Sequence, residues 1–199
     1  MQSAMSRTGN QRGQGARLRE ELIAAARALI VRPQTLELPS LRAVARDVGV
    51  APSAVYLHFA SGEDLVDAVI DEQFGELRHA LESCGDDLAA RAATYVRWGL
   101  SNPGAYQLLF ESADRLPALA DGRRPGWDLV QRLQELIAAR TGRSEAAAFP
   151  IALRLWTGLH GIVSLRLHKP DLAWPTTPED EAADAAANAL RPPSGGMPE

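Results

Sequence analysis

The hydrophobic pattern at the start of the chain predicts a long helix. Before the first proline, apolar residues recur at intervals of three and four, which is the spacing of one face of a helix. The members of this face are Leu18, Leu22, Ala25, Ala26 and Leu29. The pattern predicts a helix over residues 17–31, and Pro33 ends it because proline cannot continue the backbone hydrogen bonding.

Two short helices with a glycine between them are predicted next. Ser40 is a good N-cap for a helix over residues 41–48, in which apolar residues lie on one face. Gly49 follows at the point where a helix end favours a left-handed residue. A third helix over residues 52–57 then begins with Pro52, which suits a first helical turn because no amide donor is needed there.

The rest of the chain shows further helical stretches separated by turn residues. Ser61 caps a fourth helix, and segments rich in proline and glycine separate the later ones. The predicted helices are residues 63–81, 86 or 87 to 101, 105–113, 127–140, 147–168 and 179–190. Alanine and leucine are abundant and β-branched residues are sparse, so the expected fold class is all-α.

Charge is distributed unevenly along the chain. The 199 residues carry a net charge of −4, but residues 1–62 hold eight arginines against four acidic residues, which leaves +4. The remaining 137 residues hold 13 basic and 21 acidic residues, which leaves −8. A basic N-terminal third on an acidic body suggests that this part binds a polyanion, although a merely solvated basic surface fits the same pattern.

Composition and motifs argue against several other functions. The one cysteine, Cys84, excludes an internal disulfide and a cysteine-cluster metal site. The four histidines have no metal-ligand spacing, and no Walker-type phosphate loop, HExxH or CxxC motif is present. We therefore expect no cofactor and no metal. No run approaches the roughly 18 apolar residues of a membrane helix, so we expect a protein without a membrane partner, located in the cytoplasm.

Two short helices joined by a tight glycine-containing turn form a helix-turn-helix, in which the first helix braces the second against a DNA major groove. The run LRAVARDVGVAPSAVYLHFASGEDLVDAV, residues 41–69, carries this motif. Residues 17–81 resemble the DNA-binding domain of the TetR/AcrR family of transcriptional regulators. The glycine, the aromatic pair and the helix cap all fall in the register of that family.

The resemblance implies roles for eight residues. Contacts with phosphate position a protein on DNA, whereas contacts with base edges read its sequence. By this resemblance, the residues that approach phosphates are Ser40, Arg42, Tyr56 and His58. The residues that face bases are Pro52, Ser53, Ala54 and Leu57.

The resemblance has one departure and leaves two alternatives open. Gly62 stands where the family usually has a lysine that meets a phosphate, so this contact is lost or supplied by another group. Ala54 and Leu57 are apolar, so they cannot recognise bases by hydrogen bonds. They can touch a thymine methyl group, and the shape of the DNA can also contribute to the choice of sequence. Two alternatives to the implied phosphate contacts remain open. Tyr56 can be a packing residue, and His58 can be a structural residue.

The C-terminal part resembles the ligand-binding and dimerisation domains of the same family. The segment LRLWTGLHGIVSL, residues 153–165, is similar to a subtype named for its Trp and His-Gly motif, here Trp156 and His160-Gly161. Family members typically dimerise through their last two long helices. The residues implied at this homodimer interface are Gly158, Gly161, Ser164 and Leu165. The alternative is that these small residues pack within one subunit.

A pocket for a small apolar or aromatic effector is implied between the C-terminal helices. Its candidate residues are the scattered aromatic side chains and one histidine, namely Trp98, Tyr106, Phe110, Trp127, Phe149, Trp156 and His160. Aromatic residues in a helical bundle are more often plain core, and this alternative stays open for each of them. His160 either donates a hydrogen bond to the effector or bonds a neighbouring helix.

These features predict a domain organisation. Residues 1–16 are expected to be a disordered basic arm, and residues 17–62 a three-helix DNA-binding domain of the helix-turn-helix type. Residues 63–190 are expected to form a helical ligand-binding and dimerisation bundle, with residues 63–81 as the connecting helix. Residues 191–199 are expected to be a disordered tail.

The function implied is that of a ligand-responsive transcriptional regulator and not of an enzyme. It would be a repressor that binds a palindromic double-stranded DNA operator as a homodimer and is released by a small molecule. The alternative is a helical small-molecule binding protein of the same fold that has lost specific DNA binding. An all-α enzyme is a more distant third reading, because no catalytic motif is present.

Overall fold

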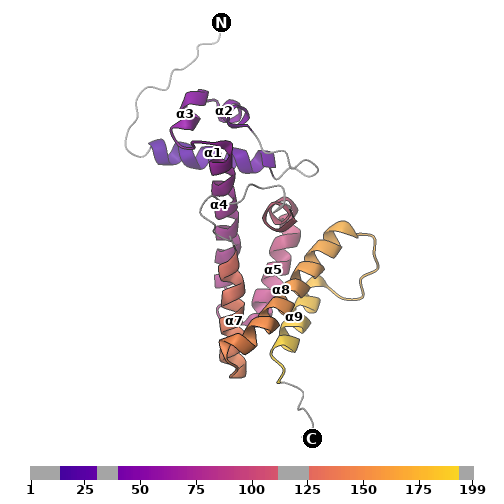
Figure 1. Cartoon of the computed structure of the whole chain (residues 1–199). Coiled ribbons are helices and arrows are strands. Elements are labelled where there is room, and N and C mark those ends of the chain that lie inside the picture. The colour runs from indigo at the N-terminus through magenta and orange to yellow at the C-terminus, as the bar shows by residue number, and fades with distance from the viewer. Residues whose placement is uncertain (1–13, 31–39, 112–125, 193–199) are drawn as a thin grey trace, which may run out of the picture. The chain divides into compact units, whose positions relative to one another are not determined.

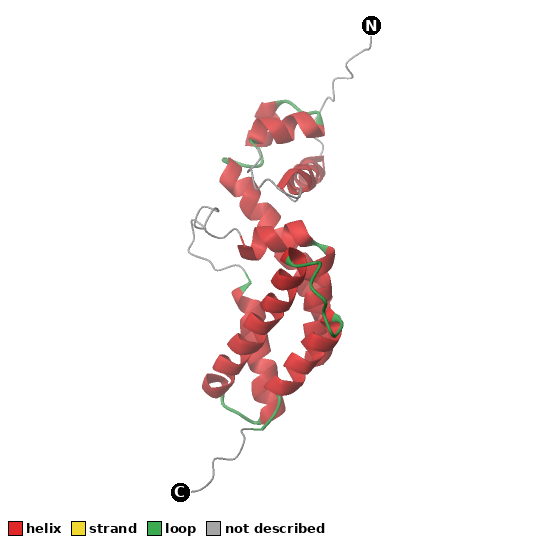
Figure 2. Cartoon of the chain, turned by 90° about the vertical axis from the view of Figure 1, so that its right-hand side faces the viewer, coloured by secondary structure: helices red, strands yellow, loops and turns green. Residues whose placement is uncertain are grey.

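The computed structural model describes residues 14–30, 40–111 and 126–192, and all regular elements in these ranges are helices (Figures 1 and 2). The predicted all-α class is therefore confirmed. The chain divides into two compact units, Met1–Val69 and Ile70–Glu199. One helix, α4 (Gly62–Glu82), crosses the boundary between them.

The first unit contains α1, α2, α3 and the start of α4. Their bounds are Gln14–Ile30 for α1, Leu41–Val48 for α2 and Pro52–Tyr56 for α3. Helix α1 begins before the predicted residue 17, so residues 14–16 of the expected arm are helical. The other residues of that arm, 1–13, lie outside the described residues, as do residues 193–199 of the expected tail.

The turn between α2 and α3 follows the predicted local chemistry. The side chain of Ser40 accepts a hydrogen bond from the backbone N–H of Ala43 at 3.2 Å. Gly49 has a left-handed backbone with φ of +76°, and its N–H bonds the carbonyls of Ala45 and Arg46. Only glycine adopts this conformation without steric cost, so the turn can reverse the chain within three residues.

The core of the first unit lies on the inner faces of these helices. Helix α2 packs against both α1 and α3. The fully buried side chains include Leu22, Ala26, Val44 and Val55, and Phe59 after α3 is 3% exposed. Burial of these side chains fixes which face of α2 and which face of α3 remain in solvent.

Helix α4 begins with a reciprocal cap. The side chain of Ser61 accepts from the N–H of Asp64, and the Asp64 carboxylate accepts from the N–H of Ser61, both at 3.0 Å. This arrangement satisfies two backbone donors that a helix start leaves free. The predicted cap at Ser61 is confirmed, with the helix beginning one residue before the expected Glu63.

The second unit is a helical bundle. Its elements after α4 are α5 (Leu88–Ser101), α6 (Pro103–Tyr106), the π-helix η1 (Gln107–Glu111), α7 (Trp127–Thr141), α8 (Glu145–His168) and α9 (Pro178–Ala189). Helix α8 packs against α5, α7 and α9, and α5 also packs against α9. Helix α8 therefore organises the bundle.

A further predicted element, near residue 103, differs from the structure. A turn at residues 102–104 followed by a helix over 105–113 was expected, whereas α6 already begins at Pro103 and continues as η1. Proline suits the first helical position, so the expected turn is itself the helix start. The last two residues of the expected helix, 112 and 113, lie outside the described residues.

A buried arginine holds the junction of α4 and α5. Arg91 is 7% exposed, and its Nη1 donates to the carbonyls of Leu81 and Gly85, both at 2.9 Å. Burial lowers the pKa of Arg91, but an arginine stays charged at any physiological pH. A cation at this position satisfies carbonyl groups at the end of α4 and opposes the negative end of its helix dipole.

Helices α5 and α8 approach each other closely at Gly99. A Cβ atom added there would lie 2.8 Å from Cγ1 of Val163 and 3.1 Å from Cδ2 of Tyr106. Real Cβ atoms essentially never lie within 3.0 Å of another heavy atom, so the contact with Val163 requires a shift, and the contact with Tyr106 is tight. Val163 is fully buried and β-branched, so its side chain has little freedom to move away.

We therefore expect Gly99→Ala to lower the free energy of unfolding by about 1–3 kcal/mol, because the added methyl overpacks the contact between α5 and α8. Unfolding in urea, followed by circular dichroism, measures this change. Gly75→Ala is the matched control, since Gly75 also lies inside a helix but an added Cβ would meet nothing within 4 Å. Helix propensity predicts that Gly75→Ala stabilises by about 0.5–1 kcal/mol. Equal stabilisation by both variants would contradict the close packing at Gly99.

Candidate functional site

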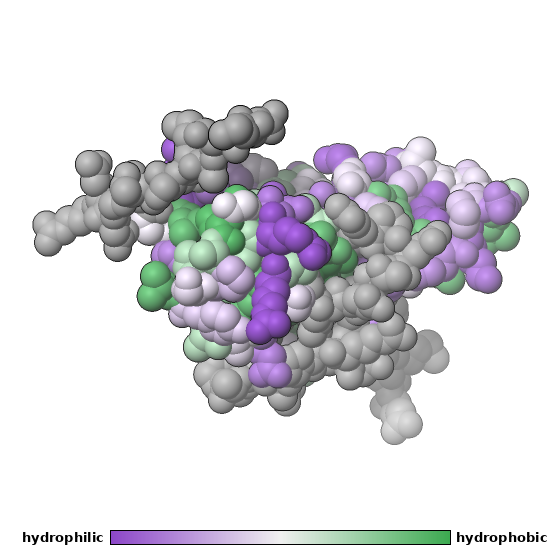
Figure 3. Space-filling model, turned by 90° about the horizontal axis from the view of Figure 1, so that it is seen from above, coloured by the Kyte–Doolittle hydropathy of each residue, from purple (hydrophilic) through white to green (hydrophobic). Residues whose placement is uncertain are grey.

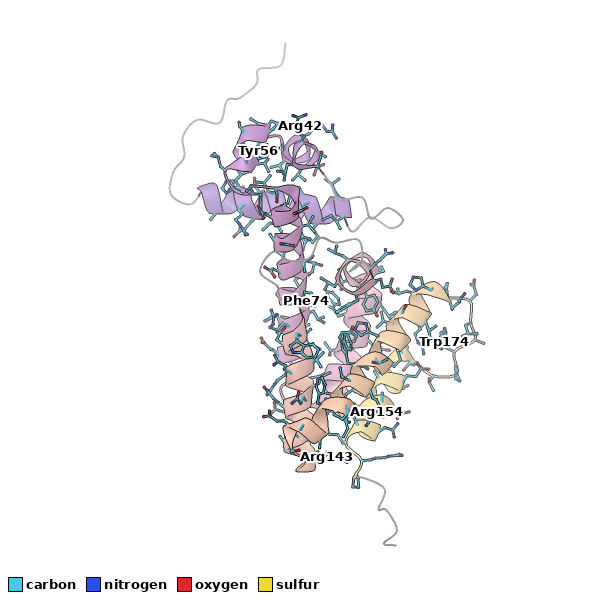
Figure 4. All side chains as sticks on the ribbon, in the orientation of Figure 1. Arg42, Tyr56, Phe74, Arg143, Arg154 and Trp174 are labelled. Atoms are coloured by element: carbon cyan, nitrogen blue, oxygen red, sulfur yellow. The ribbon has the colours of Figure 1, made fainter. Side chains whose placement is uncertain are left out.

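The residues predicted to contact DNA lie on α2, on α3 and directly beside these helices. Arg42 on α2 and Tyr56 on α3 come from neighbouring helices, as Figure 4 shows. The exposed members of the set are Ser40, Arg42, Pro52, Ser53, Tyr56 and Leu57, while Ala54 and His58 are half-buried. Val44 and Val55, fully buried, take the opposite faces. We call the exposed set the α2–α3 face.

The α2–α3 face combines polar and apolar chemistry. The structure seen from above, with α2 and α3 toward the viewer, has hydrophilic and hydrophobic residues next to each other at the surface (Figure 3). Tyr56 is 55% exposed and Leu57 is 82% exposed. Packing inside the unit thus does not account for the Tyr56 side chain, and the alternative of a mainly structural Tyr56 is disfavoured.

Ser40 has two roles that are compatible. Its side-chain oxygen accepts the capping hydrogen bond from Ala43. A hydroxyl has one donor proton besides its acceptor lone pairs, so the O–H remains available to a phosphate oxygen. The cap therefore holds the Ser40 hydroxyl in place without consuming its donor.

His58 lies beside the start of α1. A Cβ atom added at Gly15 would come within 3.8 Å of the His58 ring, and the His58 backbone N–H bonds the carbonyl of Val55 at 2.9 Å. This neighbourhood explains why the ring is half-buried, so a packing role for His58 stands beside the predicted phosphate contact.

Gly62 occupies the first position of α4, and an added Cβ would meet nothing within 4 Å. The space that a longer side chain would need is therefore open. The arginines suggested as substitutes for the missing lysine include Arg7 and Arg12, which lie outside the described residues. Within the described part, the guanidinium of Arg19 stacks on the Phe59 ring at 5.2 Å.

A second group of candidate residues surrounds His160 of α8. Its ring lies 4.5 Å from both the Phe110 and Trp156 rings, in edge-to-face arrangements. Tyr95 and Tyr106 contact it at 5.5 and 5.7 Å between ring centroids. Edge-to-face packing of this kind is favourable beyond the burial of area alone. We call these five residues the His160 cluster.

Hydrogen bonds join the polar atoms of the His160 cluster. Tyr106 Oη lies 2.7 Å from Nδ1 of His160, and Tyr95 Oη lies 3.0 Å from Nε2. Burial lowers the pKa of His160 to about 4. Burial also raises the pKa of both tyrosines above their usual value. At neutral pH the cluster therefore carries no charge and offers only neutral hydrogen-bonding groups.

The predicted pocket residues do not all gather at this cluster. Tyr106, Phe110, Trp156 and His160 do, whereas Trp127 and Phe149 form a separate pair with ring centroids 6.0 Å apart. None of the ring contacts around His160 involves Trp98. The seven candidates were predicted individually, and Trp127 and Phe149 contact each other instead of the His160 cluster.

Sequence reasoning missed two aromatic residues of this region. Tyr95 bonds His160. Phe74 of α4, which Figure 4 labels, packs edge-on against Phe110 with ring centroids 5.7 Å apart. Tyr95 lies one turn before Trp98 on the same helix, which was a usable signal. Phe74 gave no such signal, because it lies in the helix predicted to connect the two domains and its partner, Phe110, is far away in the sequence.

The residues predicted at a dimer interface lie along α8. An added Cβ at Gly158 or Gly161 would meet nothing within 4 Å in this chain, and Leu165 is 52% exposed. The Ser164 hydroxyl donates to Glu111 Oε1 at 3.0 Å, which is a contact of the kind expected under the alternative of packing within one subunit. Ser164 thus bonds η1 within the chain, the two glycines leave open space, and the interface stays a prediction for all four residues.

The geometry combines a capped helix-turn-helix with a helical bundle, and two family models match these parts. A model described as bacterial regulatory proteins, tetR family, matches residues 22–69. A model described as a tetracyclin repressor-like C-terminal domain matches residues 88–190, which is more than half of the chain. The chain belongs to the tetR family.

The two models of the tetR family cover both candidate sites. The N-terminal match contains the whole α2–α3 face, and the C-terminal match contains the His160 cluster. Phe74 lies between the two matched segments. Both models describe regulatory proteins, and neither describes an enzyme.

Individual tetR-family relatives are similar to this chain to different extents. The HTH-type transcriptional regulator Rv1816 of Mycobacterium tuberculosis is 30% identical over 82 residues, which cover 37% of this chain and 35% of that protein. The chain thus spans about a third of the length of the curated relatives it matches.

Solved structures share the fold over most of the chain. The putative regulatory protein SCO4313 is similar with a TM-score of 0.73 at 22% identity, covering 92% of this chain and 100% of that one. The multidrug binding protein EbrR complexed with imidazole is similar with a TM-score of 0.61 at 21% identity, covering 90% and 93%. At sequence identities this low, the similarity to these two structures shows a shared fold and nothing more.

The neutral state of His160 predicts a pH dependence of stability. The folded pKa of about 4 lies below the ordinary value near 6.5, so between these values the unfolded chain binds a proton that the folded protein does not. The contribution of neutral His160 to the free energy of unfolding is fully present above about pH 6.5. As the pH falls toward 4, this contribution is lost, and the free energy of unfolding falls by up to about 3 kcal/mol.

Urea unfolding at several pH values between 7 and 4 measures this effect. We expect the free energy of unfolding of His160→Asn to fall less between pH 7 and 4 than that of the wild type, because the contribution of His160 is removed. The matched control is His79→Asn, at an exposed position on α4, which should keep the wild-type profile. A wild-type profile in His160→Asn would show that His160 is not the group responsible.

Proposed function

We propose that this tetR-family protein is a ligand-responsive transcriptional repressor in the cytoplasm. It binds a palindromic DNA operator as a homodimer and is released by a small apolar or aromatic molecule. The observation that carries the proposal is the α2–α3 face, where a capped helix-turn-helix keeps Arg42, Tyr56 and Leu57 in solvent together. A core helix pair would bury such side chains.

On DNA, α2 braces α3 and α3 enters the major groove. Ser40, Arg42, Tyr56 and His58 contact phosphates and set the position of the unit. Pro52, Ser53, Ala54 and Leu57 face the bases. Arg42 supplies the charge, and the hydroxyls of Ser40 and Tyr56 supply neutral hydrogen bonds.

Helix α8 supports the homodimer. It is apolar and long enough to cross a membrane by length and composition, yet only 28% of its most apolar stretch is buried within the described chain. Arg154 lies in its middle, where a membrane would make a charge costly (Figure 4). Open space at Gly158 and Gly161 suits a helix of a second subunit, because small residues allow close approach.

A dimer also meets the geometric need of a helix-turn-helix. Two copies of α3 have to reach successive major grooves, roughly 34 Å apart, to read the two halves of a palindrome. A second copy doubles the number of bases that are contacted. Dimerisation through α8 and α9 brings two DNA-binding units into one molecule.

The His160 cluster supports an uncharged or weakly polar effector. Its aromatic rings offer apolar contact, and Tyr95, Tyr106 and His160 offer neutral hydrogen bonds. The similar fold of EbrR, a multidrug binding protein solved with imidazole, accommodates a small molecule. A neutral cluster would disfavour an effector with a full charge, since burying an unpaired charge is costly.

Helix α4 provides the route from effector to DNA. Phe74 of α4 packs against Phe110, which itself contacts His160. The N-terminal turns of α4 place Leu65, Val66 and Val69 in buried positions of the first unit. An effector that moves Phe110 therefore shifts α4 and changes the spacing between the α3 helices of the two subunits. This shift couples the effector site to the DNA interface.

Gly62 favours a second candidate, a small-molecule binding protein of this fold that has lost specific DNA binding. The position expected to hold a phosphate-binding lysine has no side chain, and the bases would face mostly apolar residues. In that case the protein binds its small molecule without any operator.

Selection of bound duplexes from a random DNA pool, with the purified full chain at moderate salt, separates the two candidates. Enrichment of a palindrome supports the repressor and provides its operator, on which small molecules can be tested for release. The absence of enrichment, with a folded dimer verified in the same sample and any co-purified small molecule removed, supports the second candidate.

Arg42→Gln tests the phosphate contact of the α2–α3 face. We expect weaker binding to every duplex and a flatter dependence of log K on log salt, since each lost phosphate contact changes the slope by about 0.9. Two copies in a dimer make the change about 1.8. Arg97→Gln is the control, because it removes the same charge from an exposed arginine of the second unit. An unchanged slope in Arg42→Gln would remove this residue from the interface.

Gly158→Glu tests the homodimer. A buried carboxylate at the interface is costly, so we expect the variant to be monomeric and to lose operator binding, while its helical content stays unchanged. Sedimentation equilibrium measures the mass. Gly75→Glu, at an equally open helical glycine of α4, should remain a dimer. A dimeric Gly158→Glu with the affinity of the wild type would place the interface elsewhere.

A further inference from the structure

One stripe of helix α8 carries an arginine among small and apolar residues. Arg154, Gly158, Gly161 and Leu165 follow each other at intervals of four, three and four, so they share one face of the helix. Arg154, Gly158 and Leu165 are exposed, and Gly161 is partly exposed. We call these four residues the α8 stripe.

The proposed homodimer places the α8 stripe against a second subunit, and Arg154 must then leave water. Within the described part of the chain, the Arg154 side chain makes no hydrogen bond or ion pair. The other arginine of α8, Arg166, is already paired with Glu181 of α9 at 3.1 Å. Removing a cation from water without an acceptor is strongly destabilising. The second subunit therefore has to supply an acceptor for Arg154.

Helix α9 offers such an acceptor at its exposed surface. Asp184 is exposed, and its carboxylate has no partner within the described residues. The other carboxylates of α9 each have a partner in the same chain, namely Arg97 for Glu179, Thr177 for Asp180 and Arg166 for Glu181. The two helices of the proposed interface thus present one unpaired cation and one unpaired anion.

Arg154 and Asp184 of the same chain lie too far apart to pair. Helices α8 and α9 are joined by a short connection and pack against each other, so they run in opposite directions. The ion pair between Arg166 and Glu181 shows which turns of the two helices are neighbours. Asp184 is three residues further along α9, beside residue 163 of α8 and roughly 14 Å from Arg154 along the helix axis.

A two-fold axis at the glycines brings the two groups together. When two copies of α8 cross in opposite directions, a residue before the crossing point meets the partner at an equal distance after it. Gly158 lies four residues after Arg154 and five before residue 163, so a crossing at Gly158 puts Arg154 beside the level of Asp184. A crossing in the same direction would place the two copies of Arg154 together, and like charges repel.

We propose that Arg154 of each subunit forms an ion pair with the partner subunit's Asp184 across a two-fold axis at Gly158. This inference rests on the proposed function, because it requires the homodimer. It adds the contact that fixes the register and direction of the two α8 helices. A second copy of this chain is the occupant because it complements both unpaired charges at once, and the symmetry makes two equivalent pairs.

Charge reversal at either position tests the ion pair. In a homodimer of Arg154→Glu, or of Asp184→Arg, like charges meet at both pairs. We expect each variant to raise the dimer dissociation constant by at least about 100-fold, measured by sedimentation equilibrium of the full chain. Both positions are exposed in one chain, so the helical content by circular dichroism should not change. Asp171→Arg, at an exposed carboxylate between α8 and α9, is the control and should dimerise as the wild type does.

Mixing Arg154→Glu with Asp184→Arg distinguishes pairing between subunits from any effect within one chain. In the mixed dimer, opposite charges face each other in both pairs. We therefore expect a heterodimer with a dissociation constant within about tenfold of the wild-type value. Native mass spectrometry identifies this heterodimer, because the two variants differ in mass. A repulsion within one chain would persist in each variant and would not be relieved by mixing.

The outcomes separate this inference from the proposed function. A monomeric wild-type protein overturns the proposed homodimer, and the ion pair with it. A dimeric wild type whose two charge-reversal variants dimerise equally well overturns the inference alone. Variants that stay monomeric when mixed also overturn it. The same holds if Asp171→Arg weakens the dimer as much as Asp184→Arg does, because the effect is then not specific to α9.

Discussion

The left-handed turn at Gly49 is the constraint on which the candidate DNA interface depends. Its φ of +76° lets the chain reverse between α2 and α3, and its N–H closes the end of α2 on the carbonyls of Ala45 and Arg46. The phase of α3 then follows, with Val55 and Phe59 in the core and Tyr56 and Leu57 in solvent. A side chain with a Cβ at position 49 would strain this backbone. The strain would disturb the exposed α2–α3 face as well as the core of the first unit.

At the His160 cluster of the second unit, polar groups lie among apolar ones and carry no charge. His160 stays neutral because burial opposes its protonation, and two tyrosine hydroxyls satisfy its nitrogens. Such a network is stable only if all its members are paired. It also connects α5, α6 and α8, while Phe110 extends it through Phe74 to α4. The same contacts that hold the bundle together are therefore suited to transmit a change at the cluster.

Local features were predictable and distant contacts were not. The caps at Ser40 and Ser61 and the bounds of α2 depend on residues within four positions, so the sequence pattern was sufficient for them. Tyr95 and Phe74 escaped notice because their partners, His160 and Phe110, are 65 and 36 positions away. The separation of Trp127 and Phe149 from the His160 cluster has the same cause. Spacing along a helix predicts a buried face but does not name the helix that covers it.

The sequence by itself determined the all-α class and the helix-turn-helix, because helical periodicity, caps and a glycine turn act over a few residues. The family followed from the resemblance of its motifs. Only the tertiary structure decided which side chains remain in solvent and which become neutral. The 82% exposure of Leu57, the buried Arg91 bonded to the end of α4, and the lowered pKa of His160 all arise from what neighbouring helices cover. Burial and desolvation are properties of packing between elements, and no local pattern specifies them.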